Sequence, residues 1–221
     1  MKTLSKEEQA AITPVMAIDL LKEGNKRFVS NLKLNRNLLQ QANETSDGQH
    51  PFAVILSCID SRTSAELIFD QGLGDIFSIR IAGNILNEDI LGSMEFACKV
   101  AGSKMIVVLG HSKCGAIKGA CDQVQMGNLT GLLDKISRAV DDEKSVQENR
   151  NSGNSEFVEK VARINVKKTA QAIVERSPVL KEMLDNGEIG IIGGMHDIST
   201  GLVTFYEDTI LLKKSEKSAM K

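Results

Sequence analysis

The sequence predicts an α/β fold in which a mainly parallel central sheet is flanked by helices. Short, unalternated apolar runs bounded by turn residues are typical of strands buried on both faces of a parallel sheet. Segments with helical spacing separate these runs, and strands that alternate with helices indicate an α/β fold with right-handed crossovers. The apolar runs are 52–56, 76–81, 105–109 and 189–192, and the helical patterns are 64–69, 88–100, 115–124, 129–140 and 157–174.

The first fifty residues predict one helix and a polar connection. Thr13 is a good N-cap residue, and Pro14 suits the first helical position. Apolar residues then recur at helical intervals to about residue 30, which predicts an amphipathic helix over 13–30. The apolar stripe of this helix needs a surface to cover it. Residues 31–49 and 141–155 are polar and predicted to be loops.

Length and composition limit the class of protein. The chain has 221 residues, which suits a single domain over 1–221. A net charge of −2 and an aromatic content of 4% argue against nucleic-acid binding. No run approaches the roughly 18 apolar residues that span a bilayer, and the N-terminus does not read as a secretory signal. We expect a cytoplasmic protein without nucleic-acid or membrane partners, or a periplasmic one if a cleaved leader preceded this sequence.

The four cysteines could form two disulfides or remain thiols and metal ligands. A chain of this size can build its own core, so cross-links are not required. Cys98 and Cys121 lie within helical patterns and are predicted to be core thiols. The other two cysteines, Cys58 and Cys114, follow predicted strands, and the residues around them decide between the disulfide, thiol and metal-ligand interpretations.

Cys58 follows the run 52–56, and His111 and Cys114 follow the run 105–109. The carboxyl ends of parallel strands are where open α/β sheets place their ligands. The spacing of His111 and Cys114 suits chelation of one metal ion, and adjacent parallel strands would bring Cys58 to them. Three protein ligands leave a fourth zinc position open for water, which becomes a nucleophilic hydroxide at neutral pH.

Asp60 and Arg62 are the candidate assistants of such a site. An ionised aspartate only accepts hydrogen bonds, so Asp60 could orient the hydroxide. Arg62 could keep that carboxylate ionised through a bidentate pair. Two rival interpretations remain: a closed structural zinc site with Cys121 as fourth ligand, and thiolate catalysis by Cys58. The second needs five residues between cysteine and arginine in a phosphatase loop, and this chain has three.

Three segments together resemble the signature segments of β-class carbonic anhydrases: 58–62 (CIDSR), 80–84 (RIAGN) and 111–115 (HSKCG). The resemblance implies one Zn²⁺ per chain on Cys58, His111 and Cys114, with Asp60 and Arg62 as the activating dyad. It implies reversible hydration of CO₂ to bicarbonate and a proton. It also implies that the N-terminal segment 1–48 is a helical arm that packs on a partner subunit, in a homodimer or a dimer of dimers.

The same resemblance assigns substrate contacts. It implies that Gln49 and the backbone amide of Gly115 contact bicarbonate, and that Phe77 and Phe96 line the CO₂ pocket. Ile55 stands where a subgroup with an inhibitory bicarbonate site carries Trp, so we expect the non-allosteric type. Hydrolysis of COS or CS₂ on the same site, or a non-catalytic zinc-stabilised protein, are the alternative functions. His196, which follows a predicted strand, is interpreted as a satisfied structural histidine rather than a proton relay.

Overall fold

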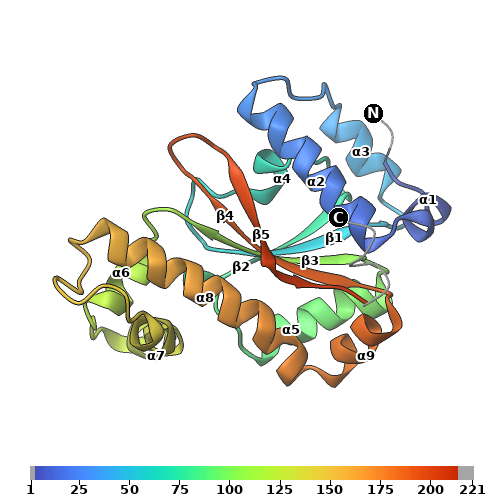
Figure 1. The fold of residues 1–221 in the computed structure, drawn as a ribbon. Coiled ribbons are helices and arrows are strands. Elements are labelled where there is room, and N and C mark those ends of the chain that lie inside the picture. Colours follow the sequence, from blue (N-terminus) through green and yellow to red (C-terminus); the bar gives the residue numbers. More distant parts are fainter. Residues whose placement is uncertain (1–2, 214–221) are drawn as a thin grey trace.

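The computed structural model describes residues 3–213, and within them a five-stranded sheet lies between two layers of helices (Figure 1). The strand order is β2-β1-β3-β4-β5. The first four strands are parallel, and β5 runs antiparallel to β4. The mainly parallel sheet predicted from the apolar runs is therefore confirmed. The strands are β1 (Ala53–Ser57), β2 (Ile76–Arg80), β3 (Met105–His111), β4 (Gly190–His196) and β5 (Val203–Leu211).

Helices cover both faces of the sheet. In Figure 1, α1 to α4 lie on one side, α5, α8 and α9 lie on the other, and α6 and α7 lie beside one end of α8. None of the helices in residues 3–213 has the length and apolar character needed to cross a bilayer. The helices are α1 (Lys6–Ala11), α2 (Pro14–Val29), α3 (Leu38–Glu44), α4 (Ala65–Ile68), α5 (Glu88–Glu95), α6 (Gly115–Cys121), α7 (Gly127–Asp142), α8 (Ser155–Arg176) and α9 (Pro178–Asn186), with short helical turns at η1 (Ala82–Asn84) and η2 (Phe96–Val100).

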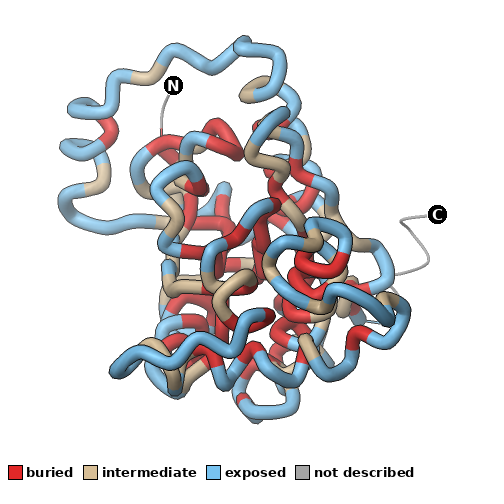
Figure 2. Tube along the Cα trace, turned by 90° about the vertical axis from the view of Figure 1, so that its left-hand side faces the viewer, coloured by how far each residue is buried: buried red, intermediate tan, exposed pale blue. Residues whose placement is uncertain are grey.

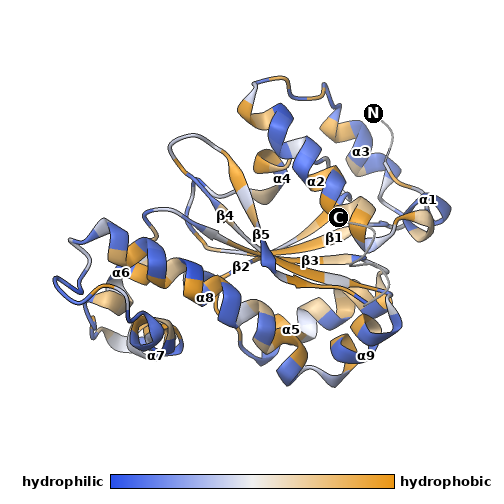
Figure 3. Cartoon of the chain, viewed as in Figure 1, coloured by the Kyte–Doolittle hydropathy of each residue, from blue (hydrophilic) through white to orange (hydrophobic). Residues whose placement is uncertain are grey.

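Alternation along the buried strands divides the core into two layers. On β1, Ala53 and Ile55 pack with α2 and α4, while Val54 and Leu56 pack with α5, α8 and α9. Every residue of β1 and β3 is buried, as a strand covered on both faces requires. Figure 2 shows the buried residues concentrated in the centre, and Figure 3 shows apolar strands between helices with one hydrophilic face.

The amphipathic helix predicted over 13–30 is α2, and Thr13 caps it through the amide of Met16. Its apolar stripe includes Ala17, Ile18 and Leu21, all fully buried against the chain's own sheet. The expectation that this stripe needs a neighbouring subunit is therefore wrong, because the sheet of the same chain covers it. Packing of the arm 1–48 on a partner stays a prediction, and its first two residues lie outside the described range.

Three helices and one strand of the described residues were not predicted from the sequence. The predicted loop 31–49 contains α3, whose sequence is mostly polar. Two further helices, α1 and α9, are short and lie outside the patterns that we identified. The edge strand β5 is buried only at Val203 and Thr209 and carries charges, so it lacks the continuous apolar run by which the other strands were recognised. The connection predicted over 141–155 is confirmed apart from its ends, where α7 and α8 extend into it.

Candidate metal centre

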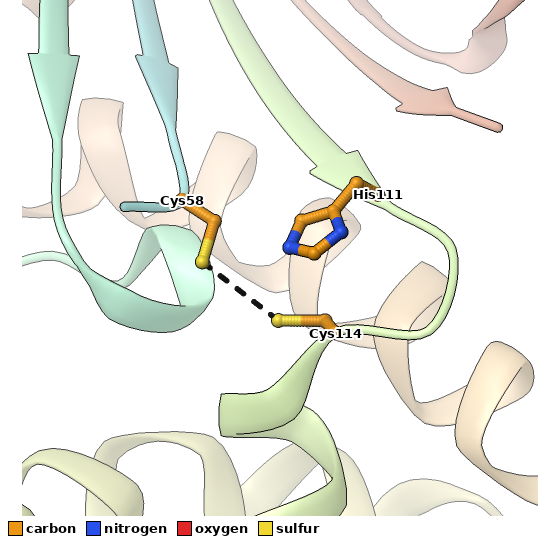
Figure 4. Close-up of side chains that lie close together, drawn as sticks. All are labelled: Cys58, His111 and Cys114. Atoms are coloured by element: carbon orange, nitrogen blue, oxygen red, sulfur yellow. Dashed lines mark hydrogen bonds between the residues drawn. The ribbon is translucent and has the colours of Figure 1, made fainter. Parts of the chain in front are cut away.

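Three elements converge at the carboxyl end of the sheet and bring two sulfurs and an imidazole together (Figure 4). Cys58 follows the last residue of β1, His111 ends β3, and Cys114 caps α6. The strands β1 and β3 are direct neighbours, so residues 53 positions apart meet. Lys113 adopts a φ of +59°, an uncommon left-handed conformation, in the turn that separates His111 from Cys114. The spatial grouping predicted for these three residues is confirmed.

The three side chains form a compact, buried donor set. Their candidate ligand atoms all lie within 4.8 Å of one another, and Cys58 Sγ is 3.9 Å from Cys114 Sγ. The exposed fractions of Cys58, His111 and Cys114 are 4%, 2% and 1%. Among the described residues, the group contains no fourth His, Cys, Asp or Glu, and Cys121 lies outside it. The geometry therefore favours a site with three protein ligands over the closed structural site.

The imidazole of His111 has the tautomer that a metal ligand requires. His111 Nδ1 lies 3.0 Å from the carbonyl oxygen of Ser112, which can only accept, so Nδ1 carries the proton. The other nitrogen, Nε2, is buried and has no hydrogen-bond partner among the described residues. A buried acceptor without a partner is costly, and a metal ion beside the two sulfurs would satisfy it. The residues present fit a thiophilic divalent ion.

The thiols of Cys58 and Cys114 shift each other's pKa in opposite directions. The hydrogen bond between them lowers the pKa of Cys58, and the same bond together with burial raises the pKa of Cys114. The backbone amide of Gly83 lies 3.4 Å from Cys58 Sγ and favours its thiolate. Gly83 has a φ of +68°, and a Cβ there would lie 2.6 Å from Ile136 Cδ1, so only glycine suits this position. The sequence analysis included Gly83 in a signature segment but gave it no role.

Asp60 and Arg62 form the pair that the sequence predicted. Arg62 Nε is 2.9 Å from Asp60 Oδ1, and Arg62 Nη2 is 2.8 Å from Oδ2. The backbone amide of Arg62 also donates to Oδ1, over 3.0 Å. The hydrogen bonds from Arg62 hold the pKa of Asp60 below its usual range, so the carboxylate stays ionised at neutral pH. The side chain of Arg62 is 52% exposed, whereas that of Asp60 is 17% exposed.

Two residues without a predicted catalytic role contact the backbone of the same turn. The hydroxyl of Thr63 lies 3.2 Å from the carbonyl oxygen of Cys58. Arg80, which belongs to the second signature segment, donates to the carbonyl oxygens of Cys58 and Asp60. No sequence signal identified Thr63, because its role depends on the path of the backbone.

The predicted substrate contacts are not gathered at the metal ligands within one chain. Phe77 and Phe96 form an edge-to-face pair with ring centroids 6.3 Å apart, and they line a surface pocket of about 660 Å³. That pocket includes none of the three candidate ligands. Gln49 is exposed and precedes the amino end of β1, whereas Cys58 follows its carboxyl end. Gly115 is the first residue of α6, next to Cys114. The substrate roles of these four residues stay predictions.

His196 lies beside His111 in the sheet, because the two are register partners on β4 and β3. Neither ring nitrogen of His196 has a hydrogen-bond partner among the described residues, so the expectation of a satisfied structural histidine is wrong. Burial, followed by the nearby His111, lowers the pKa of His196. Cys98 and Cys121 are buried free thiols, as predicted, and burial raises their pKa values to about 12 and about 11.

Comparisons with known proteins show which family this chain resembles. A sequence model described as carbonic anhydrase matches residues 53–203. The chain is 37% identical to carbonic anhydrase 2 of Mycobacterium tuberculosis, over 85% of this chain and 90% of that protein. It is 35% identical to the carbonic anhydrase of Mycolicibacterium smegmatis, over 86% of this chain and 92% of that protein. The solved β-carbonic anhydrase CcaA is 28% identical, with a TM-score of 0.68 over 87% of this chain and 96% of that one.

Proposed function

The chain belongs to the β-class carbonic anhydrases and is an enzyme of that family, and we propose that it hydrates CO₂ reversibly to bicarbonate and a proton with one zinc ion per chain. The observation that carries this proposal is the buried cluster of Cys58, His111 and Cys114. Two thiolates and one imidazole form a donor set typical of zinc. Three ligands leave the fourth position of a tetrahedral ion to water, as catalytic zinc sites do.

A zinc ion at this site would supply acidification of water and so a nucleophile at neutral pH. The residues of the chain control its surroundings. His111 keeps its tautomer through the carbonyl group of Ser112, so that Nε2 faces the sulfurs. Gly83 donates to Cys58 Sγ, and the amides of Ala116 and Ile117 favour the thiolate of Cys114. These donors offset part of the cost of burying two anionic sulfurs.

Asp60 is the proposed catalytic residue because it is ionised and can only accept a hydrogen bond. Its carboxylate would accept a hydrogen bond from the attacking water and thereby direct an oxygen lone pair toward CO₂. Arg62 fixes the carboxylate with one side-chain hydrogen bond to each of its two oxygens. Because Arg62 holds the pKa of Asp60 low, this orientation should persist over the whole neutral and alkaline range.

We also propose that the chain self-associates, as a homodimer or a dimer of dimers. The segment that follows α2 and the start of α3 carry large apolar side chains at their surface, and Leu32 and Leu39 are 70% and 74% exposed. Phe96 and Val100 form a second exposed apolar area on η2. Exposed apolar groups of this kind often mark contact surfaces between proteins. Light scattering at micromolar concentration tests this proposal, and an active monomer would contradict it.

Stopped-flow CO₂ hydration on protein of measured zinc content tests the proposed activity. We expect hydration in the wild type, with about one zinc per chain. The variant Cys114→Ser removes one of three protein ligands and should lose most of the zinc and the activity together. Cys98→Ser is the matched control, because Cys98 is buried in the other part of the core. Full zinc retention in Cys114→Ser, or zinc-loaded wild type without hydration activity, would contradict the proposal.

A further inference from the structure

The turn after β1 carries both a candidate metal ligand, Cys58, and the proposed catalytic residue, Asp60. The carbonyl oxygens of these two residues contact the same two side chains. Thr63 Oγ1 is 3.2 Å from the carbonyl oxygen of Cys58 and 2.9 Å from that of Asp60. Arg80 Nε is 3.2 Å from the first oxygen, and Arg80 Nη2 is 2.6 Å from the second. The two side chains therefore tie residues 58 and 60 to each other.

The two contacts reach the turn from different elements. Arg80 is the last residue of β2 and the register partner of Ser57, so it connects the turn to the neighbouring strand. Thr63 follows within the same turn and is only 1% exposed, and its amide donates to the carbonyl oxygen of Asp60 over 2.9 Å. Its hydroxyl is shielded from water and has a single proton to share between the two oxygens.

The hydrogen bonds between Asp60 and Arg62 do not fix the position of this pair relative to Cys58. Arg62 sets the orientation of the carboxylate, but it lies on the same turn, and its side chain is half exposed. Asp60 and Arg62 would therefore shift together if the turn moved relative to Cys58. The contacts of Thr63 and Arg80 join the carbonyl groups of Asp60 and Cys58 from outside the pair, in addition to the interaction of the Asp60 backbone with the Cys58 sulfur.

We propose that Thr63 and Arg80 are positioning residues that hold the Asp60 carboxylate at a fixed place relative to the metal ligand Cys58. This inference rests on the proposed function, because Asp60 is the catalytic residue there. A misplacement of about 1 Å can cost about 100-fold in rate. A hydroxyl that only stabilised the fold would instead affect unfolding without affecting turnover.

Thr63→Val tests the proposal, because it keeps the shape of the side chain and removes its hydroxyl. Thr63→Ser is the conservative rescue. Thr209→Val is the matched control, since Thr209 is also buried and its hydroxyl also contacts two backbone groups, the amide of Gly193 and the carbonyl of Tyr206, on the far strands β4 and β5. Arg80→Met, at an exposed position, provides a second variant that does not depend on repacking the core.

We expect Thr63→Val to keep one zinc per chain and an unchanged KM, while kcat falls about 3- to 10-fold, the equivalent of one hydrogen bond. Thr63→Ser should stay within about twofold of the wild type, and Thr209→Val should leave kcat unchanged. In the double variant of Thr63→Val and Arg80→Met, the buried carbonyl of Cys58 loses both donors, so the loss should exceed the product of the single losses. Hydrogen exchange of the Arg62 and Thr63 amides should be faster in Thr63→Val and unchanged in Thr209→Val.

The results separate this inference from the proposed function. If Thr63→Val matches Thr209→Val in both kcat and amide exchange, Thr63 has no positioning role. If Thr63→Val loses zinc, the hydroxyl supports the ligand rather than Asp60, which also overturns the inference. If the zinc-loaded wild type does not hydrate CO₂, the proposed function fails, and the amide exchange rates still report whether Thr63 and Arg80 hold the turn.

Discussion

Replacing Asp60 with asparagine changes one oxygen of the carboxylate to an amide NH₂ group. Both oxygens of Asp60 accept from Arg62, over 2.9 and 2.8 Å, so each amide orientation turns one contact into an unfavourable one. In either orientation the NH₂ group faces an N–H group of the guanidinium, and it can also donate to the attacking water and compete for the lone pair that CO₂ needs. Loss of one oriented electrostatic contact costs on the order of 10² to 10³ in kcat. The ion pair with the half-exposed Arg62 contributes little to folding, so the loss should appear in the rate rather than in stability.

The assay for Asp60→Asn is kcat/KM for CO₂ hydration against pH, with zinc content measured on the same samples. We expect zinc to be retained and the rate to fall by a similar factor from about pH 6 to 9, because Arg62 holds the pKa of Asp60 below this range. Asp142→Asn, which removes the carboxylate of an exposed pair with Lys168, is the control and should keep wild-type rates. A much smaller loss at alkaline pH would indicate that Asp60 gates the site, and near wild-type rates throughout would refute its role.

Three further predictions concern the metal site, a buried ion pair of the N-terminal segment and the response to bicarbonate. Gly83→Ala forces a left-handed φ on alanine and a contact with Ile136, so it should lower stability by about 1–3 kcal/mol and loosen zinc, and an unchanged melting temperature would contradict this. Asp70→Asn breaks a buried ion pair and should lower the free energy of unfolding by about 3–5 kcal/mol in denaturant titrations, whereas a loss below 1 kcal/mol would contradict it. Although burial raises the pKa of Asp70, hydrogen bonds from arginines leave it lowered, so this stabilisation is present at neutral pH and should be lost as acid protonates the carboxylate. Bicarbonate should show normal saturation without cooperative inhibition, because Ile55 stands where the subgroup with an inhibitory bicarbonate site carries Trp, and sigmoidal inhibition in a bicarbonate titration would place the chain in that subgroup.

The parts of the site that sequence predicts are those fixed by strand ends. Cys58 and His111 each follow a continuous apolar run, and such runs become neighbouring parallel strands whose carboxyl ends coincide. Asp60 and Arg62 are close in the chain, so their pairing needs only one turn. For these residues, position along the sequence and the period of the apolar pattern determine position in space.

The remaining contacts depend on geometry that no residue pattern encodes. The hydroxyl of Thr63 meets two carbonyl groups only because the turn after β1 folds back on itself. Gly83 approaches Cys58 because its backbone adopts a left-handed φ. The strand β5 is mostly not buried and carries charges at an edge of the sheet, so its pairing with β4 decides its structure more than its own apolar content.

The same contrast applies to the N-terminal segment. The apolar stripe of α2 was predicted correctly, but the periodicity of a helix does not specify which surface covers it. The structure places that stripe on the chain's own sheet, while exposed leucines lie beyond it, after the end of α2 and at the start of α3. Partner contacts therefore have to be sought at Leu32 and Leu39 rather than along the stripe.

We propose that one zinc ion on Cys58, His111 and Cys114 gives this chain its CO₂ hydration activity. The most direct test follows stopped-flow CO₂ hydration while zinc is added back to metal-free protein in increments. We expect activity to rise in proportion to bound zinc and to stop rising at one ion per chain, and we expect the metal-free form of Cys114→Ser to gain almost no activity. Hydration that is unchanged after zinc removal, or that Cys114→Ser recovers fully, would contradict it.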